Sequence, residues 1–268
     1  MSYGYLSEAT VCRYQNLFDE FLFAIKQMET VDIVTLTKEI PPIFVHITKR
    51  RIKGFCKTIS SLAKSLFSIS KDTYSNYKQG TIKKYTQNGF NSCKEKIKSI
   101  NTKLIKICKF GKQNPKEFIT KYGPFLLAFA LGINFGSGGL DGDGGLPDLD
   151  LEFGIGAHRS ILSHGIIMGI TAECAIIIIS LLSDVVLKKL PKEHDVFWDN
   201  VHDKKQEIIH GLLMGISAGL AYHLTIDGTL DIKAYSDLPF HNIPIEGHQC
   251  IFITQAGIEG IDVSNKEF

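Results

Sequence analysis

Three apolar segments in the second half of the chain limit the architectures that it can adopt. They cover residues 123–136, 161–187 and 208–226. A helix of about 20 mostly apolar residues crosses the hydrocarbon core of a bilayer, and the second and third segments reach or approach that length. Glycines within them recur four residues apart, a spacing that lets membrane helices pack closely. The pattern predicts three transmembrane helices, with a buried hairpin of a soluble helical protein as the alternative.

The first half of the chain is strongly basic, although the formal net charge of all 268 residues is only +2. Between Phe44 and Lys121 there are 19 Lys and Arg residues against three Asp and Glu. Apolar residues spaced three and four apart predict amphipathic helices here and in residues 1–40. We expect Pro41-Pro42 to end the first helical stretch, and further breaks near Gly80 and Gly89. The predicted fold is all-α, with a basic helical region at residues 1–121 and a membrane domain at 122–268.

Three functions are compatible with the basic region. It can be the solvated face of an ordinary helical domain, a surface attracted to anionic lipids, or a nucleic-acid binding surface. Nucleic acid is the least favoured partner, because arginine is rare and no recognised binding motif is present. Six cysteines without a CxxC pair argue against a zinc ribbon or a disulfide framework.

The distribution of lysine predicts the orientation of the three segments. The basic block precedes the first segment, and the connector at residues 188–207 carries five lysines. The positive-inside rule places both in the cytoplasm. The Asp-rich loop at 140–160 and the end of the third segment then lie together on the other side, while His202 and His210 lie at the cytoplasmic end.

Candidate metal ligands gather at the non-cytoplasmic end. The loop contains Asp148-Leu149-Asp150, followed by His158 and His164, and the third segment ends with His223 and Asp227. The i, i+4 spacing puts His223 and Asp227 on one helix face. Two or three histidines with carboxylates suit one or two Zn²⁺ or Mn²⁺ ions. A structural acidic turn is the simpler interpretation of the loop, and calcium is disfavoured because Gly145 and Leu146 break the EF-hand pattern.

These residues carry a family resemblance. The stretches 147–150 (PDLD), 158–164 (HRSILSH) and 223–227 (HLTID) resemble the PDxD, HRxxxTHS and HxxxD signatures of bacterial inner-membrane metal-dependent hydrolases, also described as LexA-binding. That family is grouped with zinc-dependent phospholipase C and the P1-type nucleases. The resemblance covers about residues 122–227. It implies metal ligands and catalytic groups among Asp148, Asp150, His158, His164, His223 and Asp227, with Arg159 neutralising an anionic substrate.

The resemblance leads us to expect a metal-dependent hydrolase of a phosphoester, with a lipid headgroup as one candidate substrate. Asp148, Asp150, His164, His223 and Asp227 would bind the metal, and His158 would act as a ligand or a general acid/base. A non-catalytic sensor, effector or pore-forming subunit is the rival. Its basic region would bind a cytoplasmic protein partner. The rival is favoured by Gly123-Pro124-Phe125, which stands where the family usually has a histidine.

Overall fold

The computed structural model describes residues 7–139, 144–149, 160–230, 234–235 and 242–265. Within these ranges the chain is all-α and contains no strand. In chain order the helices are α1 (Glu8–Lys26), α2 (Thr30–Lys78), α3 (Ile82–Gln113), α4 (Pro115–Ser137), α5 (Ile166–Lys189), α6 (Phe197–Asp203), α7 (Lys205–Thr229) and α8 (Ile245–Asn265). The predicted fold class is therefore confirmed.

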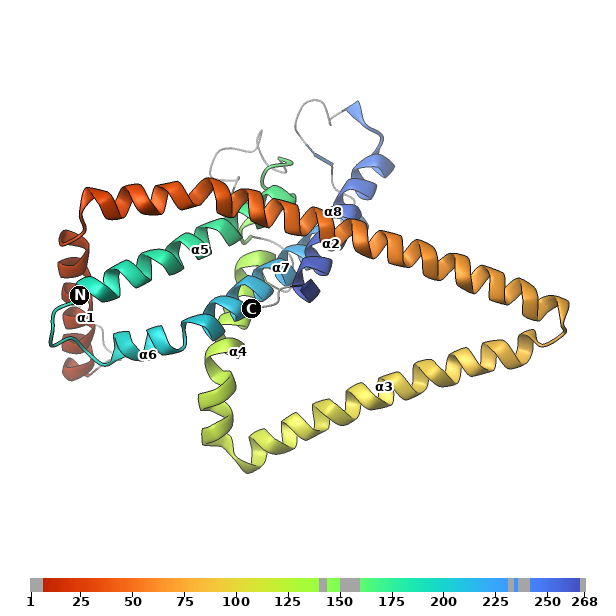
Figure 1. Ribbon diagram of the computed structural model, residues 1–268, viewed down its shortest axis with the longest axis horizontal. Coiled ribbons are helices and arrows are strands. Elements are labelled where there is room, and N and C mark those ends of the chain that lie inside the picture. Colours follow the sequence, from red (N-terminus) through yellow and green to blue (C-terminus); the bar gives the residue numbers. More distant parts are fainter. Residues whose placement is uncertain (1–6, 140–143, 150–159, 231–233, 236–241, 266–268) are drawn as a thin grey trace.

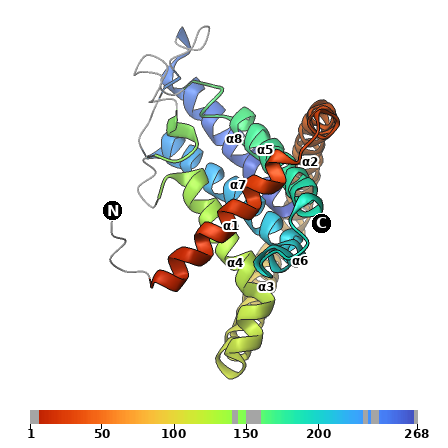
Figure 2. The ribbon, with the colours of Figure 1, turned by 90° about the vertical axis from the view of Figure 1, so that its left-hand side faces the viewer.

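The three predicted apolar segments correspond to α4, α5 and α7, each of which is long and apolar enough to cross a membrane. They form a bundle with α8, which packs along α7 (Figures 1 and 2). The change of composition at Tyr122 lies inside α4. Helices α3 and α4 are separated only by Asn114. The second half of the chain thus contributes a fourth bundle helix, α8, besides the three membrane-length ones.

Glycines make the contact between α4 and α7 close. Gly132 and Gly136 of α4 face Gly215 and Gly219 of α7, and the backbones touch along this line, which continues to Gly211 beside the backbone of Phe125. A Cβ atom on Gly215 would lie 2.9 Å from the backbone nitrogen of Ile133 and nearer still to the carbonyl oxygen of Phe129. No side chain fits there unless the helices move apart. The four-residue glycine spacing is therefore the packing surface that the sequence indicated.

Helix α2 is longer than the sequence predicted. The prediction that Pro41-Pro42 ends a helix is wrong, because α2 continues through both prolines to Lys78. Contacts on each side hold it: Asp32 pairs with Lys189 of α5 at 2.8 Å, and Arg50 and Arg51 bind α5 and α8. Tertiary contacts outweigh the local cost of two missing amide donors. The chain does turn at Gly80, which has φ 67°, but α3 passes through Gly89 without a break.

Two arginines of α2 enter the bundle through a buried ionic cluster. Arg51 binds Glu259 of α8 and also lies 3.1 Å from Glu173 of α5. Arg50 binds Glu173 at 2.7 Å and Asp262 of α8 at 3.0 Å. Burial lowers the pKa of Arg51, but the surrounding carboxylates outweigh this effect and raise it above the ordinary value. The cluster joins α2, α5 and α8. Beyond it the rest of α2 leaves the bundle, and α3 returns to the start of α4 (Figure 1).

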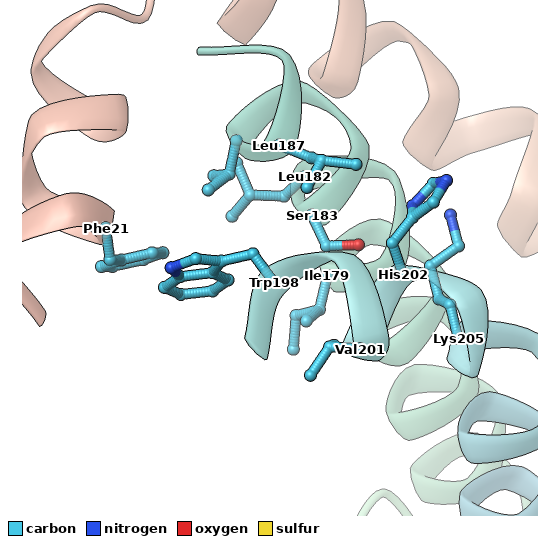
Figure 3. Close-up of a pocket in the computed structure, with 10 residues that line it drawn as sticks. Phe21, Ile179, Leu182, Ser183, Leu187, Trp198, Val201, His202 and Lys205 are labelled. Atoms are coloured by element: carbon cyan, nitrogen blue, oxygen red, sulfur yellow. The ribbon is translucent and has the colours of Figure 1, made fainter. Parts of the chain in front are cut away.

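A small apolar cavity lies where α1 and α6 meet α5 (Figure 3). It has a volume of about 180 Å³, and Phe21 and Trp198 stack beside it with ring centroids 6.3 Å apart. His202 lies at its rim, 3.7 Å from Asp184. His210, in the second turn of α7, packs against Phe125 of α4. Both histidines are therefore at the lysine-rich end, as predicted.

Candidate metal centre

Asp148, His164 and His223 converge at the end of α4 and α7. One potential ligand atom from each of them lies within 4.8 Å of the others. His164 and His223 are buried, and their ring centroids are 5.3 Å apart. Asp227 completes the group, with Oδ2 3.4 Å from His223 Nε2 and 3.9 Å from His164 Nε2. The up-down-up arrangement of α4, α5 and α7 therefore brings four of the predicted site residues together.

The end of α4 positions Asp148. Gly138 caps the helix with φ 73°, and the chain returns so that the amide of Leu146 donates to the carbonyl of Phe135 at 2.7 Å. Gly145 has φ 76° and lies directly against the backbone of Gly138, where a side chain would collide. The glycines of the loop thus fold it tightly onto α4. This places the carboxylate of Asp148 3.2 Å from His164 Nε2.

The carboxylate of Asp148 is held ionised. Partial burial raises its pKa, but hydrogen bonds with His164 and with the amide of Gly144, together with the charge of His223, lower it to about 2. A carboxyl group with a depressed pKa stabilises the fold above its unfolded value of about 4. That contribution is lost only as the pH falls towards 2. At neutral pH Asp148 is an anionic oxygen donor.

The hydrogen bonds of His223 direct a nitrogen lone pair towards the other site residues. Its Nδ1 lies 3.3 Å from the carbonyl oxygen of Ser137, which can only accept, so Nδ1 carries the proton. In the neutral ring Nε2 is then an acceptor, and it is buried without a hydrogen bond among the described residues. It faces the carboxylate oxygen of Asp227 at 3.4 Å. Two acceptors at this distance repel unless a cation, either a proton or a metal ion, lies beside them.

His164 has a comparable arrangement. Ser163 Oγ lies 3.1 Å from its Nδ1, which leaves Nε2 directed at Asp148 and Asp227. Metal-binding histidines usually bond through the second ring nitrogen to a neighbouring group, which fixes the ring. Tetrahedral ligands about 2.0–2.2 Å from zinc lie roughly 3.3–3.6 Å from one another. The 3.2 and 3.4 Å separations in this cluster are close to that range, and the third, between His164 and Asp227, is 3.9 Å. The group of Asp148 and two buried histidines could hold a metal ion.

A supporting group from the C-terminal part of the chain was not predicted from the sequence. The hydroxyl of Tyr235 donates to the carbonyl of His164 at 2.8 Å, and Gln255 of α8 donates to that hydroxyl at 2.8 Å. The side-chain oxygen of Gln255 also accepts the amide of Ile166 at 2.8 Å. These contacts fix the start of α5, and hence His164. No local pattern marks Tyr235, because its role depends on the way α8 packs against α7.

We expect Tyr235→Phe to loosen the site without removing a ligand. The carbonyl of His164 would lose its donor, and the ring of His164 would be held less firmly. Loss of such supporting bonds typically weakens metal binding 10–100-fold. Zinc affinity of the purified protein, measured by competition with a chelator, tests this. Tyr77→Phe, on the exposed part of α2, is the control, and an unchanged affinity of Tyr235→Phe would contradict the assignment.

Five further residues bear on the site. Asp150, His158 and Arg159 lie outside the described residues, so their positions stay predictions. His248 accepts the backbone amide of Tyr235 through Nδ1 at 3.1 Å. Glu173 belongs to the ionic cluster with Arg50 and Arg51, away from His164.

Comparison with known proteins identifies no relative: no family model, no curated protein and no solved structure matches this chain. The assignment of the site therefore rests on its own geometry.

Proposed function

We propose that this protein is a membrane-bound, metal-dependent hydrolase of a phosphoester, and that a lipid headgroup is its substrate. The observation that carries the proposal is the convergence of Asp148, His164 and His223 within 4.8 Å, beside Asp227. Three helices of membrane length hold this group at their common end. A phospholipid presents its phosphoester at the end of such helices, where the bilayer meets water.

The residues have distinct roles in this proposal. His164, His223, Asp148, Asp150 and Asp227 hold the metal, for which zinc or manganese suits the mixture of imidazole and carboxylate donors. When bound, such an ion lowers the pKa of water towards about 7 and polarises a phosphoryl oxygen. Arg159 binds the anionic phosphate group, and His158 is a further ligand or exchanges a proton with the reacting oxygen. Ser137, Ser163 and Tyr235 orient the two buried histidines.

We further propose that the protein lies in a bacterial inner membrane, with its N-terminal region in the cytoplasm. The support is the distribution of lysine. The end of α3, which leads into α4, is basic, and so are the end of α5 and the start of α7. The candidate metal ligands lie at the opposite ends of α4, α5 and α7. The site would then face the outer leaflet and the periplasm.

The hydrolase proposal predicts that binding and catalysis can be separated. We expect the detergent-purified full chain, loaded with zinc or manganese, to cleave a phospholipid or a chromogenic phosphodiester. Arg159→Ala should keep the metal and lose activity by about 10²-fold or more, because one charge-stabilising group is removed. Lys57→Ala on α2 is the control for a lost positive charge. A metal-loaded protein that cleaves none of these phosphoesters would contradict the proposal.

A further inference from the structure

Two hollows meet at the lysine-rich end of the bundle, between α4 and α7. The first, of about 630 Å³, is lined by Lys116, Thr120 and Lys121 of α4 together with Lys204 at the start of α7, and most of the surface in it is apolar. The second, also about 630 Å³, continues along α4 and shares Thr120 and Lys204 with the first. The two hollows therefore form one groove with a basic end, lined by three lysines, and an apolar end.

The basic end is suited to an anion. Three lysines line it, and Glu117 is the acidic side chain in the lining. Lys204 lies 3.2 Å from Glu207, and Lys121 lies over the ring of Tyr122 at 5.4 Å. Glu207 therefore offsets part of the charge of Lys204. Lys116 is exposed beside them, and three lysines against Glu117 and Glu207 leave the local charge positive.

The apolar end is suited to a hydrocarbon chain. Its lining consists of residues of α4 and α7, and among them are Ile119, Leu127, Leu131 and Ile208. Leu127 and Leu131 are 65% and 50% exposed, and they lie in a helix apolar enough to cross a membrane. Gly123 and Pro124 line the groove next to the basic end. Apolar surface of this kind, starting at a cluster of lysines, matches a molecule with an anionic head and an apolar tail.

We propose that this groove binds a phospholipid with an anionic headgroup. The phosphate lies among Lys116, Lys121 and Lys204, and one acyl chain follows α4 past Leu127 and Leu131. Basic pockets between membrane helices on the cytoplasmic side recognise acidic lipid headgroups in this way. Phe118 and Tyr122 pack together at the same corner, with ring centroids 5.2 Å apart, and aromatic rings are typical of the level of the headgroups.

The lipid site is distinct from the metal centre. It lies at the beginning of α4 and α7, whereas Ser137 and His223, which contact one another, lie towards their other ends. A lipid bound here contacts both α4 and α7 and stabilises their pairing. The lipid has a structural role, and its binding does not depend on whether the protein is a hydrolase.

The test is thermal unfolding of the full chain in a neutral detergent. Added phosphatidylglycerol should raise the midpoint, because a ligand that binds only the folded state stabilises it. Phosphatidylcholine should raise it less, and inorganic phosphate should have no effect because it lacks the acyl chain. Replacing Lys116, Lys121 and Lys204 by glutamine should weaken the apparent affinity for phosphatidylglycerol about a hundredfold, since each lysine near an anionic lipid contributes about 1 kcal/mol.

Two further variants localise the effect. Lys57, Lys64 and Lys71 of α2, changed together to glutamine, give the same loss of charge away from the groove and should leave the affinity largely unchanged. Gly123→Leu should fill the apolar end and weaken lipid binding, because a Cβ there meets only Ile119 within 4 Å and the fold tolerates it. Equal responses to the two lipids, a full response to inorganic phosphate, or an unchanged affinity in the α4–α7 triple variant would each overturn the proposal.

Discussion

Replacing Gly215 by leucine should separate α4 from α7 and destabilise the bundle by about 3 kcal/mol or more. The α-carbon of Gly215 faces Gly132, and a Cβ atom at position 215 would lie 3.0 Å from the α-carbon of Gly132, as well as 2.9 Å from the nitrogen of Ile133. The atoms that an added Cβ would meet belong to the backbone, which cannot change rotamer as a flexible side chain can. The whole line of contact from Gly211 to Gly219 would have to open.

The measurement is the midpoint of thermal unfolding by circular dichroism, together with the elution profile of the detergent-solubilised protein. Gly257→Leu is a matched control, because Gly257 is also a helical glycine but has nothing within 4 Å of an added Cβ. It gains helix propensity at no steric cost. A Gly215→Leu protein that unfolds at the same temperature as the control would show that α4 and α7 do not pack through their glycines.

Removing Arg51 should destabilise the protein by about 3–5 kcal/mol, the usual cost of leaving the partners of a buried ion pair uncompensated. The side chain of Arg51 is 1% exposed, and it binds Glu259 and Glu173, whose side chains are 0% and 1% exposed. Arg51→Ala leaves these carboxylates in an apolar interior with one cation fewer. Because α2, α5 and α8 meet at this cluster, we expect the contact of α2 with the bundle to loosen as well.

Arg13→Ala provides the comparison. Arg13 also pairs closely with a carboxylate, that of Asp195 at 2.8 Å, but its side chain is 58% exposed. Exposed pairs of this kind contribute about 0–1 kcal/mol. Unfolding midpoints of the two variants should therefore differ clearly. Proteolysis within α2 should also increase in Arg51→Ala and not in Arg13→Ala. Equal stability of the two variants would mean that the cluster does not hold α2 in place.

The sequence was informative about features that depend on periodicity. The lengths of the apolar segments predicted α4, α5 and α7, and the glycine spacing predicted the packing surface between α4 and α7. Gly165 and Gly169 instead lie against side chains of α8. Counting helices up, down and up was sufficient to bring Asp148 and His164 to His223 and Asp227. These inferences succeed because a helix of fixed rise converts sequence separation into distance.

Features that depend on tertiary contacts were not predictable in the same way. Pro41 and Pro42 break helices in isolation, but α2 is held on both sides by ion pairs with residues more than 100 positions away. The roles of Tyr235 and Gln255 arise only once α8 packs beside α7. In each case the partner lies on another element, and local patterns carry no information about it.

The metal content of the purified protein tests the central claim most directly. We expect the full chain, purified in detergent and free of affinity tags that bind metal, to contain at least one equivalent of zinc or manganese per chain. Asp148→Ala/His223→Ala, which removes an anionic oxygen and the buried Nε2 acceptor, should contain little or none. The mutant Glu246→Ala, with a carboxylate removed at the start of α8, should keep the metal. An absence of stoichiometric metal from the wild-type protein, including after incubation with either ion, would contradict the account.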